Sequence, residues 1–323
     1  MNMKRIGIWI LCLTLLLGAV GILSGCEGQK NPTTADNNGI TVVCTNFAGF
    51  DFVRSMLAYY TEEGGTGVVQ LIMLGKPEQD MHSFEPSAQD IITLAGADVV
   101  ICTGAEGWLD GAMKSSGNTV VQVISMMAAC ETVDSEQNHD HNHGGEDCTL
   151  IGQDEHVWLS LGNAVRICNT ISYALQKVDR DNAKAWLIAQ TQYGHELDQL
   201  HGEYADTVHS ASRHDVVVAD RNPFVYLFED LGLNYLAAFP GCSSEISASF
   251  ETQAKLIRYT KKWELPYIFI MEGSDGKVAQ VVSNETGAEI LTLHSLQVVT
   301  DYENTTYLAV MRQNLENLKK ALQ

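Results

Sequence analysis

Positively charged residues are scarce in this sequence. It has 20 Lys and Arg against 40 Asp and Glu, which gives a formal net charge of −20 at pH 7 over 323 residues. A surface this acidic repels phosphate backbones, so we exclude nucleic acid as a partner. The same carboxylates attract cations, although weakly and without selectivity.

Two sequence signatures are also absent. There is no His-Glu-x-x-His signature of zinc proteases, and no segment repeats with a period of 20 to 50 residues. Cysteine says less, because an even number of thiols outside the cytosol can pair or stay reduced. Cys130 and Cys148 could form a disulfide across the loop between them, whereas apolar surroundings favour buried free thiols at Cys44, Cys102 and Cys168.

The first residues have the layout of a targeting segment. Lys4 and Arg5 precede an apolar run at 6–23, and Leu-Ser-Gly-Cys follows, ending at Cys26. This ending resembles the lipobox of bacterial lipoproteins, whose cysteine carries the lipid. An uncleaved membrane anchor is the alternative. We expect 1–25 to be a signal peptide and 26–38 a flexible tether. The rest would lie outside the cytoplasm, lipid-anchored to the bacterial cell membrane.

Strand and helix patterns alternate through both halves of the chain. Buried strands are predicted near 40–44, 68–74, 98–104 and 119–125, and again near 215–220, 233–239, 267–272 and 289–293. Helices are predicted between them, and a last helix near 304–322. This alternation predicts an α/β fold with parallel sheets covered on both faces.

Residues 181–212 differ from the flanking segments. Apolar residues recur there every three or four positions, which is the period of one helix face: Trp186, Ala189, Tyr193, Leu197, Leu200, Tyr204 and Val208. Such a helix would be roughly 40 Å long, more than a small lobe needs. We therefore predict that it joins an N-terminal α/β lobe at 39–180 to a C-terminal α/β lobe at 213–323.

Candidate metal ligands fall after predicted strands or in loops. They come from both halves of the chain: His82, His156, Asp220, Glu272 and His294. Ligands of parallel sheets bind at the carboxyl ends of the strands. This distribution suits a metal site in the cleft between two lobes. Taken singly, each residue could equally be a surface histidine or a helix cap.

Two motifs resemble those of the metal-binding lipoproteins of bacterial zinc and manganese ABC importers, the cluster A-I solute-binding proteins. His82-Ser83-Phe84-Glu85-Pro86-Ser87 is similar to the segment holding the family's first ligand, and Asp154-Glu155-His156-Val157-Trp158 to that holding its second. Glu272 matches a family glutamate, and His294 stands where the last ligand, usually aspartate, is found. The resemblance covers nearly all of 40–323.

One position departs from the family. The third ligand there is histidine or glutamate, but Arg221 occupies the position here. A guanidinium has no lone pair for a metal. Asp220, Glu245, Glu272 or water could complete the site, and of these we predict Asp220. The expected ligand set is thus His82, His156, His294 and Asp220.

The loop at 131–155 carries His139, His141 and His143 among acidic residues, with no Lys or Arg. Such a segment buries too little apolar surface to be ordered, so it forms at most a weak, adjustable zinc site or only a solubilising loop. A histidine-acidic insert at this place is typical of the family's zinc branch.

These expectations combine into one function. The resemblance implies a monomeric, non-enzymatic carrier that binds Zn²⁺ and presents it to a membrane ABC permease. An extracellular zinc hydrolase is the rival from another class, because histidine and carboxylate ligands also build catalytic zinc sites. A manganese-binding or adhesin protein on the same scaffold would differ in its ion or its partner.

Overall fold

The computed structural model describes residues 39–75, 79, 84–132, 153–241, 243 and 248–323. Gly39–Gln323 forms one compact unit, and the expected signal peptide, tether and Cys26 lie outside the described residues. His82, Cys148, the loop histidines and Glu245 also lie outside them. None of the described helices is both long and apolar enough to cross a membrane.

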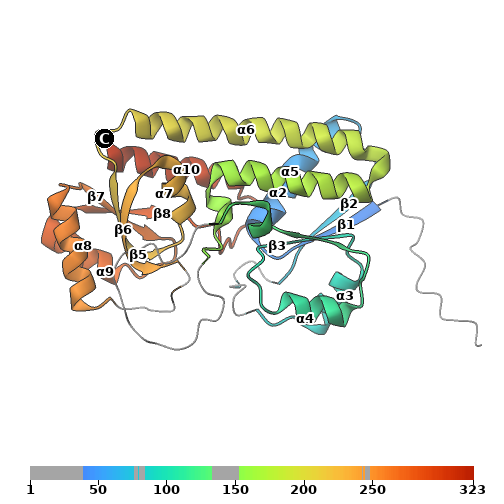
Figure 1. Cartoon of the computed structure of the whole chain (residues 1–323), viewed down its shortest axis with the longest axis horizontal. Coiled ribbons are helices and arrows are strands. Elements are labelled where there is room, and N and C mark those ends of the chain that lie inside the picture. The colour runs from blue at the N-terminus through green and yellow to red at the C-terminus, as the bar shows by residue number, and fades with distance from the viewer. Residues whose placement is uncertain (1–38, 76–78, 80–83, 133–152, 242, 244–247) are drawn as a thin grey trace, which may run out of the picture. The chain divides into compact units, whose positions relative to one another are not determined.

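The first half contains a parallel sheet in the order β2-β1-β3-β4 (Figure 1). Its strands are β1 Gly39–Cys44, β2 Val68–Met73, β3 Val99–Cys102 and β4 Gln122–Ser125. The helices of this half are α2 Phe47–Glu62, α3 Ala88–Ala95, α4 Leu109–Ser116 and α5 Leu161–Val178, with a 3₁₀ turn at Met127–Ala129 and another, η3, at Val157–Leu159.

The second half repeats the arrangement in the order β6-β5-β7-β8, again parallel. Its strands are β5 Asp215–Asn222, β6 Asn234–Pro240, β7 Tyr267–Met271 and β8 Glu289–Leu293. Its helices are α7 Val225–Leu231, α8 Phe250–Lys262, α9 Lys277–Thr286 and α10 Tyr307–Leu322. The predicted α/β fold with two parallel sheets is confirmed.

The predicted long helix is α6, Ala183–His209, which follows a 3₁₀ turn at Arg180–Asn182. It passes along the elements of both halves (Figure 1) and packs against α2, α5 and α10. All seven apolar residues predicted on one face are buried. Those side chains join strand residues of both sheets in one hydrophobic core, which explains why α6 connects the halves.

Strand residues are buried on both faces of each sheet, as parallel sheets require. Val43 and Val100 belong to a second apolar cluster on the outer side of the first sheet, and Val217 and Ile268 to a third beside the second sheet. Cys44, Cys102 and Cys168 are buried free thiols, as predicted. Cys130 is a half-buried free thiol. Because Cys148 lies outside the described residues, the disulfide between the two stays a prediction.

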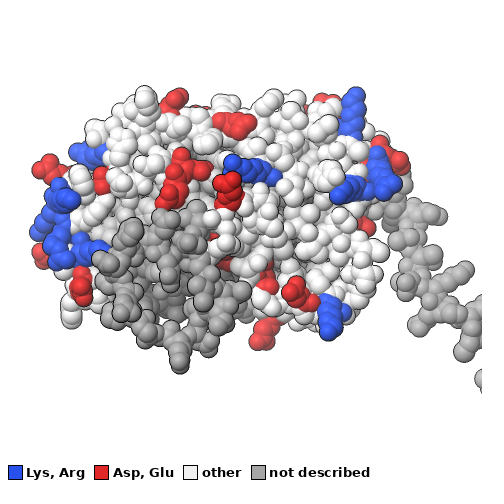
Figure 2. Space-filling model, viewed as in Figure 1, with Lys and Arg blue, Asp and Glu red and all other residues white. Residues whose placement is uncertain are grey.

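Charged residues are spread over the surface. In Figure 2, several Lys and Arg side chains gather at the edge formed by α8, while elsewhere on this face they are separated and have acidic side chains among them.

Candidate functional site

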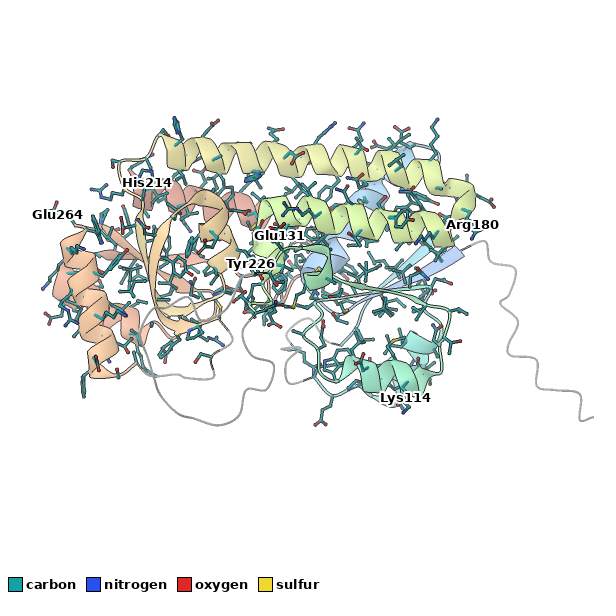
Figure 3. All side chains as sticks on the ribbon, viewed as in Figure 1. Lys114, Glu131, Arg180, His214, Tyr226 and Glu264 are labelled. Carbon is teal, nitrogen blue, oxygen red and sulfur yellow. The ribbon has the colours of Figure 1, made fainter. Side chains whose placement is uncertain are left out.

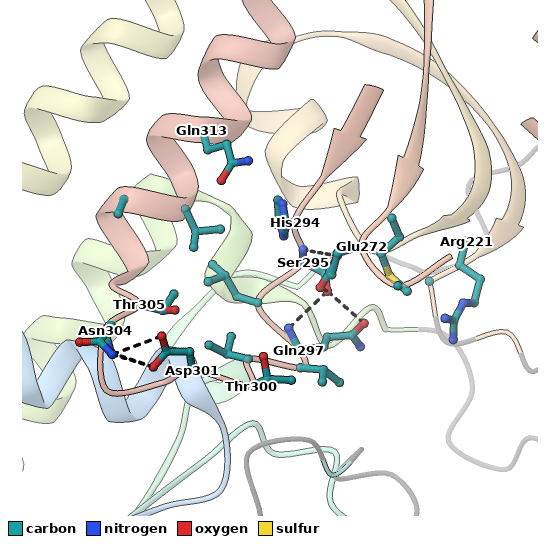
Figure 4. A pocket seen from close by; sticks show the side chains of 18 of the residues that line it. Arg221, Glu272, His294, Ser295, Gln297, Thr300, Asp301, Asn304, Thr305 and Gln313 are labelled. Carbon is teal, nitrogen blue, oxygen red and sulfur yellow. Dashed lines mark hydrogen bonds between the residues drawn. The ribbon is translucent and has the colours of Figure 1, made fainter. Parts of the chain in front are cut away.

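A cavity of about 940 Å³ lies beside the carboxyl ends of the second sheet's strands. Arg221 lines it from β5, Glu272 from the residue after β7 and His294 from the residue after β8 (Figure 4). The segment between β8 and α10 forms much of the remaining wall. Two of the residues singled out in the sequence, Glu272 and His294, therefore share this cavity.

Glu272 is held by Ser295. The Ser295 backbone N–H donates to Glu272 Oε2 over 2.8 Å, and the Ser295 hydroxyl donates to Oε1 over 2.5 Å. Burial raises the pKa of the Glu272 carboxyl, while the hydrogen bonds from Ser295 and the nearby His294 act in the opposite direction. Two fixed donors orient the carboxylate, so its direction is set before any ligand arrives.

His294 is positioned through its backbone. Its N–H donates to Asn314 Oδ1 over 2.8 Å, and Asn314 Nδ2 donates back to the His294 carbonyl over 2.9 Å. Asn314 is fully buried on α10. This reciprocal pair fixes the chain where β8 ends, while the half-buried imidazole lines the cavity.

His156, which directly precedes the η3 turn, is fully buried. Asp154 Oδ1 accepts from the His156 backbone N–H over 2.9 Å and lies 2.8 Å from Nδ1. Because a carboxylate only accepts, Nδ1 carries a hydrogen, and in the neutral ring Nε2 then keeps its lone pair, with Glu155 Oε1 3.9 Å away. Gln297 Nε2 lies 2.6 Å from that nitrogen and donates to it, and Gln297 itself lines the cavity. Gln297 thus connects the buried His156 ring to the cavity.

Gly241 closes the other side of the His156 ring. A Cβ at Gly241 would come within 3.1 Å of His156 Cε1 and 3.0 Å of the Asn222 carbonyl oxygen. Most real Cβ contacts are longer than these, so a larger residue here would require the imidazole ring or the neighbouring backbone to shift by a few tenths of an ångström. The constraint at Gly241 is one of space, since this residue has no positive φ.

The segment around His156 is tied to the second half by buried hydrogen bonds. Tyr226 Oη, from α7, donates to the Asp154 carbonyl over 2.7 Å, and Trp158 Nε1 donates to the Ser295 carbonyl over 2.9 Å. Figure 3 places Tyr226 beside the segment that leads to α5. Tyr307 Oη also donates to the Trp158 carbonyl over 2.6 Å. These contacts hold His156 against the loop that contains Gln297.

Asp220 points elsewhere. Its Oδ1 accepts from the Arg221 backbone N–H over 2.8 Å and its Oδ2 from the Met271 N–H over 3.2 Å. Both oxygens therefore face backbone of the sheet, and Asp220 is not among the described residues that line the cavity. Among the described residues, no three His, Cys, Asp or Glu are grouped closely enough to hold an ion.

Sequence reasoning overlooked two participants in this site. Gln297 contacts His156 although 141 positions separate them, and no sequence pattern marks a single loop glutamine. Asp154 orients the imidazole, and its place two residues before His156 was a usable signal, because ligand histidines regularly donate their second N–H to a carboxylate. Asp154 Oδ2 is buried without a partner among the described residues.

Known proteins with similar sequences and structures place the chain in a family. The family model described as zinc-uptake complex component A, periplasmic, matches residues 54–321. The zinc-binding protein AdcA of Streptococcus pyogenes serotype M6 is 27% identical over 322 residues, covering 95% of this chain and 61% of AdcA. This chain thus spans less than two thirds of that relative. The high-affinity zinc uptake system protein ZnuA of Bacillus subtilis is 26% identical over 327 residues, covering 99% and 98%.

Solved structures agree on the fold. The metal-dependent lipoprotein YcdH of Bacillus subtilis has a TM-score of 0.67 at 25% identity, covering 88% of this chain and 99% of YcdH. A zinc-bound AdcAII variant of Streptococcus pneumoniae has a TM-score of 0.71 at 22% identity, covering 88% and 99%. Because the family model matches well over half of the sequence, this chain belongs to the family of zinc-uptake component A proteins, the cluster A-I solute-binding proteins.

Proposed function

We propose that this chain captures Zn²⁺ outside the cytoplasm and delivers it to a membrane ABC importer. Its family supports this function, as do the names of relatives, among them a zinc-binding protein and a zinc uptake system protein. The cavity at the strand ends supplies a place for the ion.

The observation that carries the proposal is the state of the His156 ring. A buried imidazole whose Nδ1 is fixed on a carboxylate, and whose Nε2 lone pair faces a cavity-lining residue, has the arrangement of a metal-ligating histidine. A histidine that served only to fill the core would need neither the oriented tautomer nor the neighbouring cavity.

The proposed ligands are His82, His156, His294 and Glu272. Glu272 replaces Asp220 in this set, because its carboxylate lines the cavity beside His294 while Asp220 faces backbone amides. Three imidazoles and one carboxylate complete a tetrahedron, the geometry that zinc adopts in closed sites. A closed site with four protein ligands binds an ion, whereas catalysis needs an open position, so the proposal is a carrier and not a hydrolase.

The remaining parts have supporting roles in this proposal. Lipid on Cys26 tethers a monomeric carrier to the membrane where the permease lies. Anchoring at the membrane keeps the carrier close to the permease and raises its effective concentration there. His139, His141 and His143 act as a loose collector that feeds the fixed site.

Calorimetric titration of zinc into the purified chain from residue 27 onward tests the proposal. We expect one tight site. His156→Ala, His294→Ala and Glu272→Gln should each weaken it by about 100-fold or more, since loss of a mere supporting group already costs about 10- to 100-fold. Asp220→Asn should leave the affinity within a few-fold.

Two controls sharpen the result. His195→Ala removes an exposed histidine of α6 and should change nothing. Circular dichroism melts of each variant separate a lost ligand from a lost fold. A tight site that survives both His156→Ala and His294→Ala would contradict the proposal, and loss of binding in Asp220→Asn with retention in Glu272→Gln would restore Asp220 as the ligand.

A further inference from the structure

Arg221 puts a permanent positive charge into the proposed metal pocket. The register of β5 against β6 shifts between Val218 and Arg221, and an irregularity of this kind re-aims the side chains that follow it. Arg221 then lines the same cavity as Glu272 and His294 (Figure 4). Its backbone N–H donates to Asp220.

The described residues leave this guanidinium without a carboxylate. No ion pair between Arg221 and a described Asp or Glu is present within 4.0 Å. The two nearest candidates are engaged elsewhere, Asp220 with backbone amides and Glu272 with Ser295. A guanidinium carries five N–H donors in a fixed fork that matches carboxylate and phosphate oxygens.

An arginine in a cation pocket is unfavourable unless an anion lies between the two charges. Arginine stays protonated and cannot coordinate zinc, so it opposes a divalent cation in the same cavity. The cavity of about 940 Å³ is also far larger than a bare ion needs and falls in the size range of pockets for small organic ligands. Charge and size therefore both point to a second component.

We infer that the pocket takes zinc together with a small oxyanion, which Arg221 binds through its fork. The oxyanion is a carboxylate or a phosphate: its oxygens accept from the guanidinium beside the four-ligand zinc site, and its negative charge offsets both cations. This inference rests on the proposed zinc binding and specifies the form in which zinc is captured.

Equilibrium dialysis of the chain from residue 27 onward tests the inference with two labelled probes, [¹⁴C]citrate and [³²P]phosphate, each with and without zinc. We expect about one equivalent of one probe to be retained only when zinc is present. The probe that binds identifies the class of oxyanion. Arg221→Gln should lower retention of that probe at least tenfold, and Arg221→Lys should do so less, because lysine keeps the charge but not the fork.

Arg258→Gln is the matched control, since it removes an exposed arginine from α8 of the same half and should retain the probe fully. Zinc content is measured in the same samples. Zinc bound with neither probe retained would overturn the inference and leave the zinc carrier standing, as would undiminished retention in a folded Arg221→Gln. Absence of bound zinc in the unmodified chain would instead refute the proposed function.

Discussion

Gln297 competes with the ion for His156, so its removal should tighten zinc binding. Its amide donates to His156 Nε2 over 2.6 Å, the same lone pair that the proposed coordination requires. Zinc must displace this hydrogen bond. Gln297→Ala abolishes the bond in the ion-free protein and leaves the bound state, where it is already broken, unchanged.

The magnitude follows from the value of one buried hydrogen bond. A net contribution of about 0.5–1.5 kcal/mol corresponds to a dissociation constant lower by about 2- to 13-fold. The same change should destabilise the ion-free protein by a similar free energy, because the buried imidazole nitrogen loses its donor. For a compact unit of this size that is a fall in melting temperature of about 2 °C per kcal/mol.

Competition titration with a chelator of known zinc affinity, together with thermal unfolding, measures both quantities. Gln313→Ala is the control, since Gln313 lines the same cavity from α10 but is not the donor to His156. Weaker zinc binding in Gln297→Ala would refute the reasoning and make Gln297 a contributor to the bound state. Unchanged affinity and stability would mean that the hydrogen bond is not formed in solution.

Four further predictions concern the site and the termini. Gly241→Ala should push on the His156 ring, lower the free energy of unfolding by about 1–3 kcal/mol in denaturant and weaken zinc binding. Gly202→Ala, with open space around it, should not destabilise the protein. Equal behaviour of the two variants would contradict the steric argument. His294→Asp should weaken zinc binding and reduce the difference between the affinities for zinc and for manganese, because manganese prefers oxygen ligands. Unchanged zinc affinity in a competition titration would exclude His294 as a ligand. Deletion of residues 136–147 should remove only weak additional zinc binding, so calorimetry that shows the tight site lost would make the loop histidines primary ligands. Cys26→Ala should release or mislocalise the protein, and radiolabelled palmitate that never enters the unmodified chain would rule out lipidation there.

Periodicity alone determined most of the fold. The three-to-four spacing of apolar residues from Trp186 to Val208 predicted the buried face of α6, because a helix repeats every 3.6 residues regardless of what it packs against. Short apolar runs bounded by turns predicted the eight strands, because strands of a covered parallel sheet are buried on both faces. The resemblance of two motifs to a known family then predicted the family, which the family model confirmed.

The choice of carboxylate needed the tertiary structure. Asp220 and Glu272 both stand at strand ends in the sequence, and spacing cannot say which way either side chain turns. Asp220 faces the Met271 amide of the neighbouring strand β7, because Val218 pairs with Phe269 there, while Ser295 orients Glu272 beside the cavity. Glu272 became the proposed ligand through contacts between segments that are distant along the chain.

The contact between Gln297 and His156 depended on tertiary structure in the same way. It exists because Trp158 and Tyr226 hold the two halves together at that point, through hydrogen bonds that span 137 and 72 positions. Local sequence encodes strands, helices and single motif residues, since those follow from short-range sterics and burial. Which lone pair meets which donor is decided only when packing brings distant segments together.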